Sequence, residues 1–189
     1  MLLNVTGMDP SLRNWGLACG KYDTDTNKLT ILHMDVVSAV LPTGKQVRQN
    51  SLDLESAFQL YRGAKVYLEG AQAVFVEVPV GSQSARAMCG YGICVGVLGG
   101  LRASGNPFFE VTPTEVKMAG PGKKTASKIE MINWAMNAHP EAPWPTYKSN
   151  GKVVISEAKA EHMADAIASI YAGLKCHAFQ SMLPLIKAA

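Results

Sequence analysis

The sequence has little of what marks several large classes of protein. It contains only four cysteines, and neither their spacing nor the chain length fits a metal finger or a small secreted disulfide scaffold. Its formal net charge is only +3, which excludes a bulk polycation. The mostly apolar run at residues 89–101 is too short to span a bilayer. We therefore expect reduced thiols, no membrane partner, and nucleic-acid contacts only where lysines and arginines are placed locally.

The apolar content indicates one full hydrophobic core. Hydrophobic residues make up 48% of the 189 residues, which is enough for a core of ordinary size. No internal repeat or low-complexity tract divides the chain, and no basic segment of a secretory signal precedes the first apolar run. We expect a single intracellular domain over residues 1–189.

The spacing of apolar residues, with the positions of glycine and proline, predicts an α/β fold. The expected strands cover residues 2–6, 15–20, 29–37, 73–78 and 108–111, with a further short strand at 152–155 inside a loop at 139–156. The expected helices cover residues 51–70, 84–101, a short segment from Thr112, 125–138 and 157–175, with Ser51 as the first N-cap. If the fourth strand runs parallel to the first through a right-handed crossover, the result is a five-stranded mixed sheet. Three of its strands are antiparallel, two are parallel, and helices cover both faces.

Two acidic residues stand where buried strands would carry only apolar side chains. Asp9 follows the first strand, and Glu77 lies in the run Val-Phe-Val-Glu-Val. An ionised carboxylate in this setting costs several kcal/mol unless a cation or a donor meets it. Asp9 has an alternative role in an Asp-Pro turn, whereas a buried strand gains nothing from Glu77. If their strands are neighbours, both carboxylates lie at one end of the sheet and indicate a shared cation.

The last predicted helix offers further ligands. His162 and Asp165 are three residues apart and share one helix face. Oxygen ligands with at most one imidazole favour Mg²⁺ or Mn²⁺ over a structural zinc ion. Taken alone, a histidine such as His162 is more often an ordinary core or surface residue, and an acid such as Glu161 near a helix start is usually solvated.

These residues belong to a set of short motifs spread over nearly the whole chain. In chain order the set is Gly7-Met8-Asp9-Pro10-Ser11 with Trp15-Gly16, Val76-Glu77, Val116-Lys117, Ala126-Ser127-Lys128, and His162-Met163-Ala164-Asp165-Ala166. In order and spacing it resembles the RuvC family of Holliday-junction resolvases. The resemblance implies a single nuclease domain with a ribonuclease H-like fold, a homodimer, and action in the cytoplasm of a bacterium or of a phage host.

The resemblance also implies a mechanism with two Mg²⁺ ions, for which Mn²⁺ would substitute. By motif match, Asp9 would bridge the ions, Glu77 would bind one of them, and Asp165 would complete the set. His162 stands where many members carry an acid and some a histidine, so it would be a metal ligand or a proton carrier. Glu161 is the alternative for that place.

Basic residues of the same motifs are expected to contact nucleic acid. Lys117 and Lys128 match positions that face the scissile phosphate, and Lys128 is included among the catalytic residues. Lys123 and Lys124 add charge on the same turn, although both also fit an ordinary solvated surface. A helix starting at Thr125 would present free N–H groups to a phosphate. The remaining residues expected to bind nucleic acid are Ser11 and Arg13.

Two features depart from the family pattern. After the catalytic glutamate the family usually offers an aromatic residue that stacks at the junction centre, whereas this chain has Pro79-Val80-Gly81-Ser82. The loop at residues 139–156 is longer than the usual link. Its residues Trp144, Tyr147, Lys148 and Lys152 could stack on bases or pack against the fold, and packing is the simpler expectation.

The favoured hypothesis is a Mg²⁺-dependent, dimeric endonuclease that resolves four-way DNA junctions or other branched DNA. One alternative keeps the metal site and acts on RNA in an RNA–DNA hybrid. A second is a junction-binding protein without catalysis, and a third is a sugar-kinase-like or actin-like ATPase, for which the chain is too short. The glycine-rich helix at residues 84–101 is the suggested dimer surface.

Overall fold

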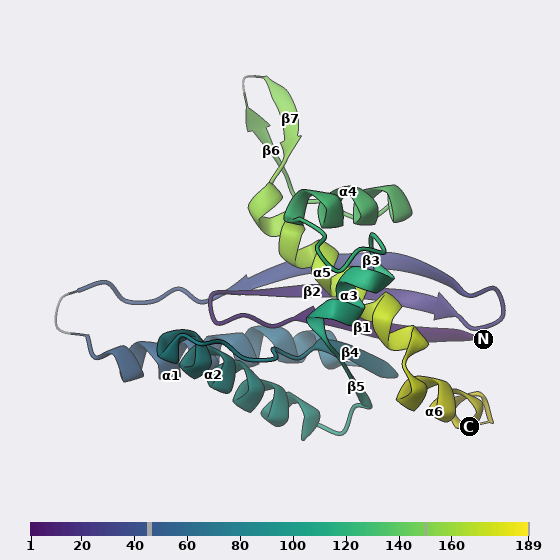
Figure 1. The fold of residues 1–189 in the computed structure, drawn as a ribbon, viewed down its shortest axis with the longest axis horizontal. Coiled ribbons are helices and arrows are strands. Elements are labelled where there is room, and N and C mark those ends of the chain that lie inside the picture. Colours follow the sequence, from purple (N-terminus) through teal and green to yellow (C-terminus); the bar gives the residue numbers. More distant parts are fainter. Residues whose placement is uncertain (45–46, 150, 189) are drawn as a thin grey trace.

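A five-stranded mixed sheet forms the centre of the molecule (Figure 1). The structure is a computed structural model that describes residues 1–44, 47–149 and 151–188. The strands are β1 (Leu2–Asp9), β2 (Asn14–Asp23), β3 (Lys28–Ser38), β4 (Ala73–Glu77) and β5 (Phe108–Val111). Their order is β3-β2-β1-β4-β5; β1, β2 and β3 are antiparallel neighbours, while β4 runs parallel to β1 and β5 parallel to β4. The predicted sheet is confirmed.

Helices cover both faces of this sheet (Figure 1). They are α1 (Gln49–Lys65), which a 3-10 turn at Val66–Leu68 follows, α2 (Ala85–Arg102), α3 (Pro113–Ala119), α4 (Lys128–Ala138), α5 (Glu157–Lys175) and α6 (His177–Ala188). A separate hairpin is formed by β6 (Thr146–Ser149) and β7 (Lys152–Ile155). Within the described residues, every helix is too short or too polar to span a bilayer.

The alternation of side chains along the strands divides the core into two layers. Val5 and Phe75 belong to the apolar cluster that contains the buried residues of α5. Met8 and Val76 belong to a second cluster, formed with α1 and α2 on the other face. Because successive side chains of a strand point to opposite faces, odd-numbered residues of β1 and β4 face α5.

Two helices start where the sequence predicted, and the first expected residue of each is its N-cap. The Ser84 side chain accepts a hydrogen bond from the backbone N–H of Ala87 and caps α2. Thr112 and Glu115 form a reciprocal capping box at the start of α3. Each of these caps satisfies backbone donors that the first helical turn leaves unpaired.

Two other helix starts differ from the prediction. α1 begins at Gln49, so Ser51 is not its N-cap, because two contacts of Asp53, one within the helix and one with α2, hold the earlier start. The Gln49 side chain donates to Asp53 across 3.0 Å, and Arg86 of α2 binds both oxygens of Asp53 across 2.6 Å. α4 begins at Lys128 instead of Thr125.

The remaining differences concern short or irregular segments. β1 continues through Gly7 to Asp9, so Asp9 is the last residue of the strand and does not follow it. β6 and α6 were not expected; α6 contains Pro184, which is unfavourable inside a helix. All four cysteines are free thiols, as expected.

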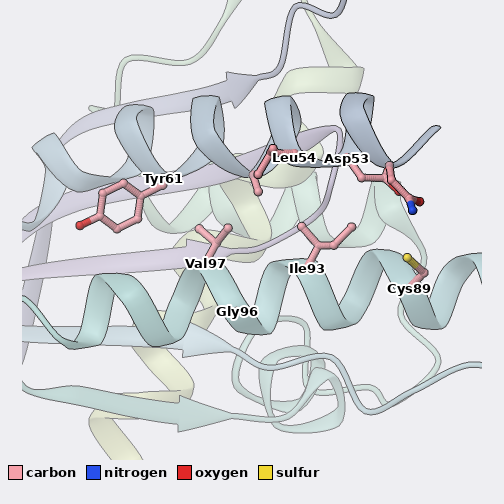
Figure 2. A pocket seen from close by; sticks show the side chains of 9 residues that line it. Asp53, Leu54, Tyr61, Cys89, Ile93, Gly96 and Val97 are labelled. Carbon is pink, nitrogen blue, oxygen red and sulfur yellow. The ribbon is translucent and has the colours of Figure 1, made fainter. Parts of the chain in front are cut away.

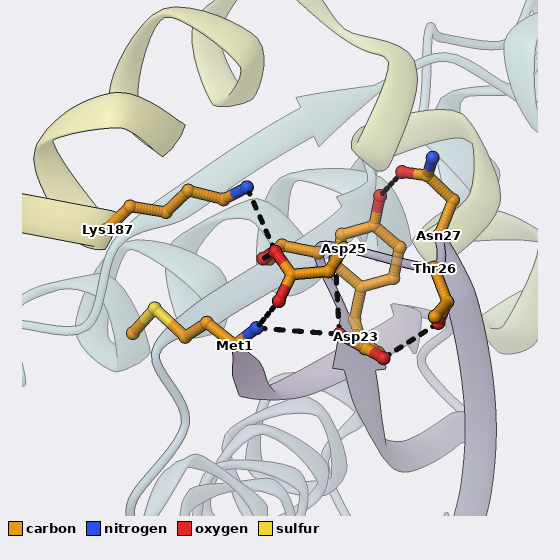
Figure 3. A network of polar contacts seen from close by, with 8 residues as sticks. Met1, Asp23, Asp25, Thr26, Asn27 and Lys187 are labelled. Carbon is orange, nitrogen blue, oxygen red and sulfur yellow. Dashed lines mark hydrogen bonds and ion pairs between the residues drawn. The ribbon is translucent and has the colours of Figure 1, made fainter.

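The end of the sheet far from Asp9 is closed by a polar network (Figure 3). The N-terminal ammonium of Met1 contacts Asp23, the last residue of β2, across 3.5 Å, and Asp25, in the turn that follows, across 2.5 Å. Lys187 of α6 lies 3.7 Å from Asp25. These contacts tie the first and last elements together and leave the opposite end of the sheet for the acidic cluster.

Candidate active site

Asp9 and Glu77 end two neighbouring parallel strands. Met8 of β1 is paired with Val76 of β4, so the next residue of each strand is a carboxylate at the same edge of the sheet. Parallel neighbours lie about 4.8 Å apart. Both side chains follow the alternation towards α5, and both are only partly exposed. The expected juxtaposition of these carboxylates is therefore present in the structure.

The helix α5 lies unusually close to this edge. A methyl group on Gly7 would lie 2.0 Å from the backbone oxygen of Ala166, and one on Gly16 would lie 2.1 Å from that of His162. Glycine in a strand often marks such a close backbone approach. Because these two glycines admit the helix backbone, α5 brings His162 and Asp165 onto the ends of β1 and β2.

His162 contacts Asp9 directly. Its Nδ1 donates a hydrogen bond to Oδ2 of Asp9 across 2.8 Å. The two side chains are 18% and 15% exposed, so water screens this contact only weakly. The hydrogen bond that His162 donates to Asp9 is the main cause that raises the pKa of His162, and the charges of Asp9, Glu161 and Asp165 act in the same direction. The site thus favours a protonated imidazole against Asp9.

The other two carboxylates hold their protons unusually strongly. Burial, followed by the charge of Asp9, raises the pKa of Glu77 to about 7, although Lys117 opposes the shift. Burial, followed by the charges of Asp9, Glu77 and Glu161, also raises the pKa of Asp165 above its ordinary value. These carboxyl groups have little exposure to solvent and lie close to one another, so they resist being ionised at the same time. A bound cation would relieve this repulsion.

The donor set fits a hard divalent cation. It consists of carboxylate oxygens and one imidazole, which suit Mg²⁺ or Mn²⁺. Within the residues that the structure describes, no three His, Cys, Asp or Glu side chains are already arranged to hold one ion. Asp9 is instead turned towards His162. The residues fit a metal by their chemistry, and binding requires Asp9 to exchange its hydrogen bond for the ion.

Two of the predicted lysines reach the acidic cluster. The ammonium of Lys128, the first residue of α4, lies 2.6 Å from Glu161, which raises the pKa of Lys128. Asp165 and Asp9 contribute to the same shift. Lys117 of α3 lies close enough to act on the pKa of Glu77. Glu161, the alternative to His162 as a metal ligand, thus forms an ion pair with Lys128.

The neighbouring turn is arranged differently from the expectation. Lys123 forms an ion pair with Glu130 across 2.9 Å, whereas Lys124 is exposed. Ser127 and Glu130 form a capping box, so Ser127 is the N-cap of α4. The prediction that a helix starts at Thr125 and presents its N–H groups there is wrong. The helix starts three residues later, because Ser127 and Glu130 together form a better cap.

The loop between β1 and β2 carries the last two predicted residues. Ser11 donates to the backbone oxygen of Asn14 across 2.5 Å and accepts from its N–H across 3.1 Å. Arg13 is exposed at the same turn. Ser11 therefore shapes the turn beside Asp9, and Arg13 is the member of this pair that a ligand can reach. The sequence alone did not indicate the close approach of Gly16 or the Lys128–Glu161 pair.

Solved structures with a similar fold include resolvases, whereas no family model matches the sequence. RuvC of Thermus thermophilus in complex with a Holliday junction substrate aligns with a TM-score of 0.64 and 22% identity over 96% of both chains. A second structure of Thermus thermophilus RuvC aligns with a TM-score of 0.63 and 23% identity, over 96% of this chain and 97% of that one. Fowlpox virus resolvase in complex with Holliday junction DNA aligns with a TM-score of 0.54 and 16% identity, over 96% of this chain and 99% of that one. The chain therefore has the ribonuclease H-like fold of RuvC over nearly its whole length.

Proposed function

We propose that the chain is a structure-selective endonuclease that hydrolyses phosphodiester bonds in four-way junctions or other branched DNA. The observation that carries this proposal is the convergence of Asp9, Glu77 and Asp165 on one end of the sheet, with Lys117 and Lys128 beside them. Carboxylates that share a buried region, next to cations that can meet a phosphate, suit metal-assisted phosphoryl chemistry. The fold shared with two resolvases supports the same substrate class.

Asp9, Glu77 and Asp165 would hold two Mg²⁺ ions, with His162 as a further ligand or proton carrier and Mn²⁺ as a substitute. When bound, such ions activate water and stabilise the leaving 3′ oxygen. Lys117 and Lys128 would neutralise the scissile phosphate and orient it over the carboxylates. His162 keeps a proton on Nδ1 against Asp9, and release of that contact frees the Asp9 oxygen for a cation.

The decisive experiment compares Asp9→Asn with the wild-type protein on a synthetic four-way junction. The substitution keeps the size of the side chain but removes its charge, so junction binding should persist while nicking falls by at least about 100-fold. Asp35→Asn is the matched control, because Asp35 lies in β3 and accepts a hydrogen bond from Tyr67 away from the acidic cluster. Unchanged nicking by Asp9→Asn would end the proposal.

The same assay separates the alternatives. An RNA–DNA hybrid of equal length tests the hypothesis that the metal site acts on RNA in a hybrid. Preferential cleavage of that hybrid would favour this hypothesis. Gel retention of the junction with no cleavage in either Mg²⁺ or Mn²⁺ would favour a junction-binding protein. That reading draws its support from His162 at a place where many RuvC members carry an acid.

We also propose that two copies associate through α2. Added methyl groups on Gly92, Gly96 and Gly99 would meet no atom within 4 Å, so none of the described residues of other elements covers this small-residue face. A groove of about 580 Å³ between α1 and α2 continues this face, with Leu54, Ile93 and Val97 among its lining residues (Figure 2). Sedimentation velocity should give the mass of a dimer, and Gly96→Glu should shift it to that of a monomer. A wild-type mass of one chain would contradict the dimer.

A further inference from the structure

The β6–β7 hairpin extends away from the rest of the molecule, beyond the first turn of α5 (Figure 1). Its two strands pack mainly on each other. The backbone N–H of Ser156 donates to the oxygen of Pro145 across 2.8 Å and closes the hairpin at its base. Two short strands alone are marginally stable, so a hairpin that projects in this way needs a firm anchor.

A buried histidine supplies that anchor. His139 is only 1% exposed, and its Nε2 lies 3.0 Å from the hydroxyl of Tyr171 in α5, while Nδ1 lies 3.0 Å from Glu141. The indole N–H of Trp144 donates to the backbone oxygen of His139 across 2.9 Å. Trp144 thus packs at the base, as expected from the sequence. The direction of the hairpin is fixed relative to the helix that carries His162.

The other three residues singled out in this loop are exposed. Tyr147 is 53% exposed, and Lys148 and Lys152 also face solvent. Val153, opposite Lys148, is 69% exposed. Residues 146–155 contain no Asp or Glu. An exposed aromatic ring, two ammonium groups and no acid add little to folding stability, but they match a partner that offers phosphates and flat apolar rings.

The position of the hairpin fits this chemistry. At about 1.5 Å per residue, His162 lies about 8 Å along α5 from its start. A four-residue strand extends about 13 Å in the other direction. The tip therefore lies on the order of 20 Å from the acidic cluster, or about six base pairs along a duplex. A two-stranded ribbon also has the width that the major groove of B-DNA admits.

We propose that the β6–β7 hairpin binds a duplex arm of branched DNA about half a helical turn from the bond that is cut. Lys148 and Lys152 contact backbone phosphates on the two sides of the ribbon, and Tyr147 packs on sugar and base edges in the groove. The inference rests on the proposed function, because it takes the acidic cluster as the point of cleavage. It assigns a contact surface that the resemblance to RuvC did not imply.

The test measures binding of a fluorescent four-way junction, in EDTA, at several salt concentrations. Lys148→Ala/Lys152→Ala should weaken binding about 10-fold or more and flatten the slope of log K against log salt by about two, one for each lost phosphate contact. The control Lys21→Ala/Lys28→Ala removes the same charge from exposed lysines at the opposite end of the sheet and should change neither quantity. Tyr147→Ala should weaken binding without changing the slope.

The outcomes separate the two proposals. If the wild-type protein binds no branched DNA, the proposed function and the hairpin contact both fail. If the wild type binds but the Lys148/Lys152 variant keeps its affinity and salt slope, only the hairpin contact is overturned. Loss of self-association in that variant, with unchanged DNA affinity, would assign the hairpin to a protein interface and would also overturn the inference.

Discussion

Nδ1 of His162 donates a hydrogen bond to Oδ2 of Asp9 across 2.8 Å, and this contact joins the last residue of β1 to α5. It places a proton among the carboxylates of the acidic cluster, beside Asp9. The same imidazole is also the nitrogen ligand proposed for a divalent cation. If His162 also binds the cation, it must leave Asp9 to do so, and its substitution then tests both roles.

Removing His162 should impair cleavage more than folding. His162→Ala eliminates the donor and the candidate ligand, so we expect the rate of junction nicking to fall about 10- to 100-fold. His33→Ala is the control, because His33 is an exposed histidine on β3. The measurement is single-turnover nicking in Mg²⁺. A rate equal to or above the wild type would show that His162 has no part in the reaction.

The stability of the metal-free protein should fall as the pH rises. The pKa of Glu77 is raised to about 7, and the pKa values of Asp165 and His162 are also raised, so the folded state holds more protons than the unfolded chain in this range. For Glu77, stability is highest below about pH 4.5 and is lost towards pH 7, with a slope of at most about 1.4 kcal/mol per pH unit. For His162, the contribution is complete below about pH 6.5 and disappears above its raised pKa.

Urea unfolding in EDTA at pH 5 and pH 7.5 tests this sign. Glu77→Gln cannot lose a proton, so it should flatten the pH dependence relative to the wild type. Mg²⁺ should restore stability at pH 7.5, because it binds the ionised carboxylates of the folded state only. A wild-type protein that is more stable at pH 7.5 than at pH 5 without metal would contradict the shared acidic environment.

Much of the site's framework was predictable from the sequence. Asp9 and Glu77 each interrupt an apolar strand pattern, and a parallel pairing of those strands brings them together. That pairing is present, with Met8 beside Val76. Asp165 was placed by its motif, and α5 carries it to the same end of the sheet. These predictions succeeded because the alternation and the order of elements restrict the possible topologies.

The remaining features of the site depend on contacts between particular side chains, which the spacing of apolar residues does not predict. Lys123 pairs with Glu130, and the Ser127 cap moves the start of α4 away from Thr125. The first strand of the hairpin was missed because three nearby prolines indicated a loop, although the Asn-Gly pair at residues 150–151 is typical of a two-residue hairpin turn. The local composition indicated a loop, whereas the structure pairs residues 146–149 with residues 152–155.

The close approach of α5 to the sheet should make Gly16 intolerant of substitution. A methyl group there would lie 2.1 Å from the backbone oxygen of His162, so α5 would have to move away from β2. We expect Gly16→Ala to lower the free energy of unfolding by about 1–3 kcal/mol, as overpacked cores do. It should also reduce nicking, because the displaced helix carries His162 and Asp165.

The matched control is Gly90→Ala in α2, outside the proposed dimer face, where an added methyl group would meet only Leu12, at the ordinary contact distance of 3.6 Å. Alanine is the better helix former, so this variant should be as stable as the wild type or up to about 1 kcal/mol more stable. Urea unfolding of both variants gives the comparison. Equal stability of the two alanine variants would mean that α5 does not rest on β2 as closely as described.

The pair formed by Lys128 and Glu161 should separate phosphate contact from metal binding. Lys128 is 75% exposed, so Lys128→Ala should change the free energy of unfolding by less than about 1 kcal/mol. Nicking should nevertheless fall about 100-fold, because the variant loses a positive charge at the scissile phosphate. Glu161→Gln leaves Lys128 charged and removes only its partner, so its nicking rate should stay within a few-fold of the wild type. If Glu161 instead took the place proposed for His162, Glu161→Gln would abolish nicking as Asp9→Asn does, while His162→Ala would remain active.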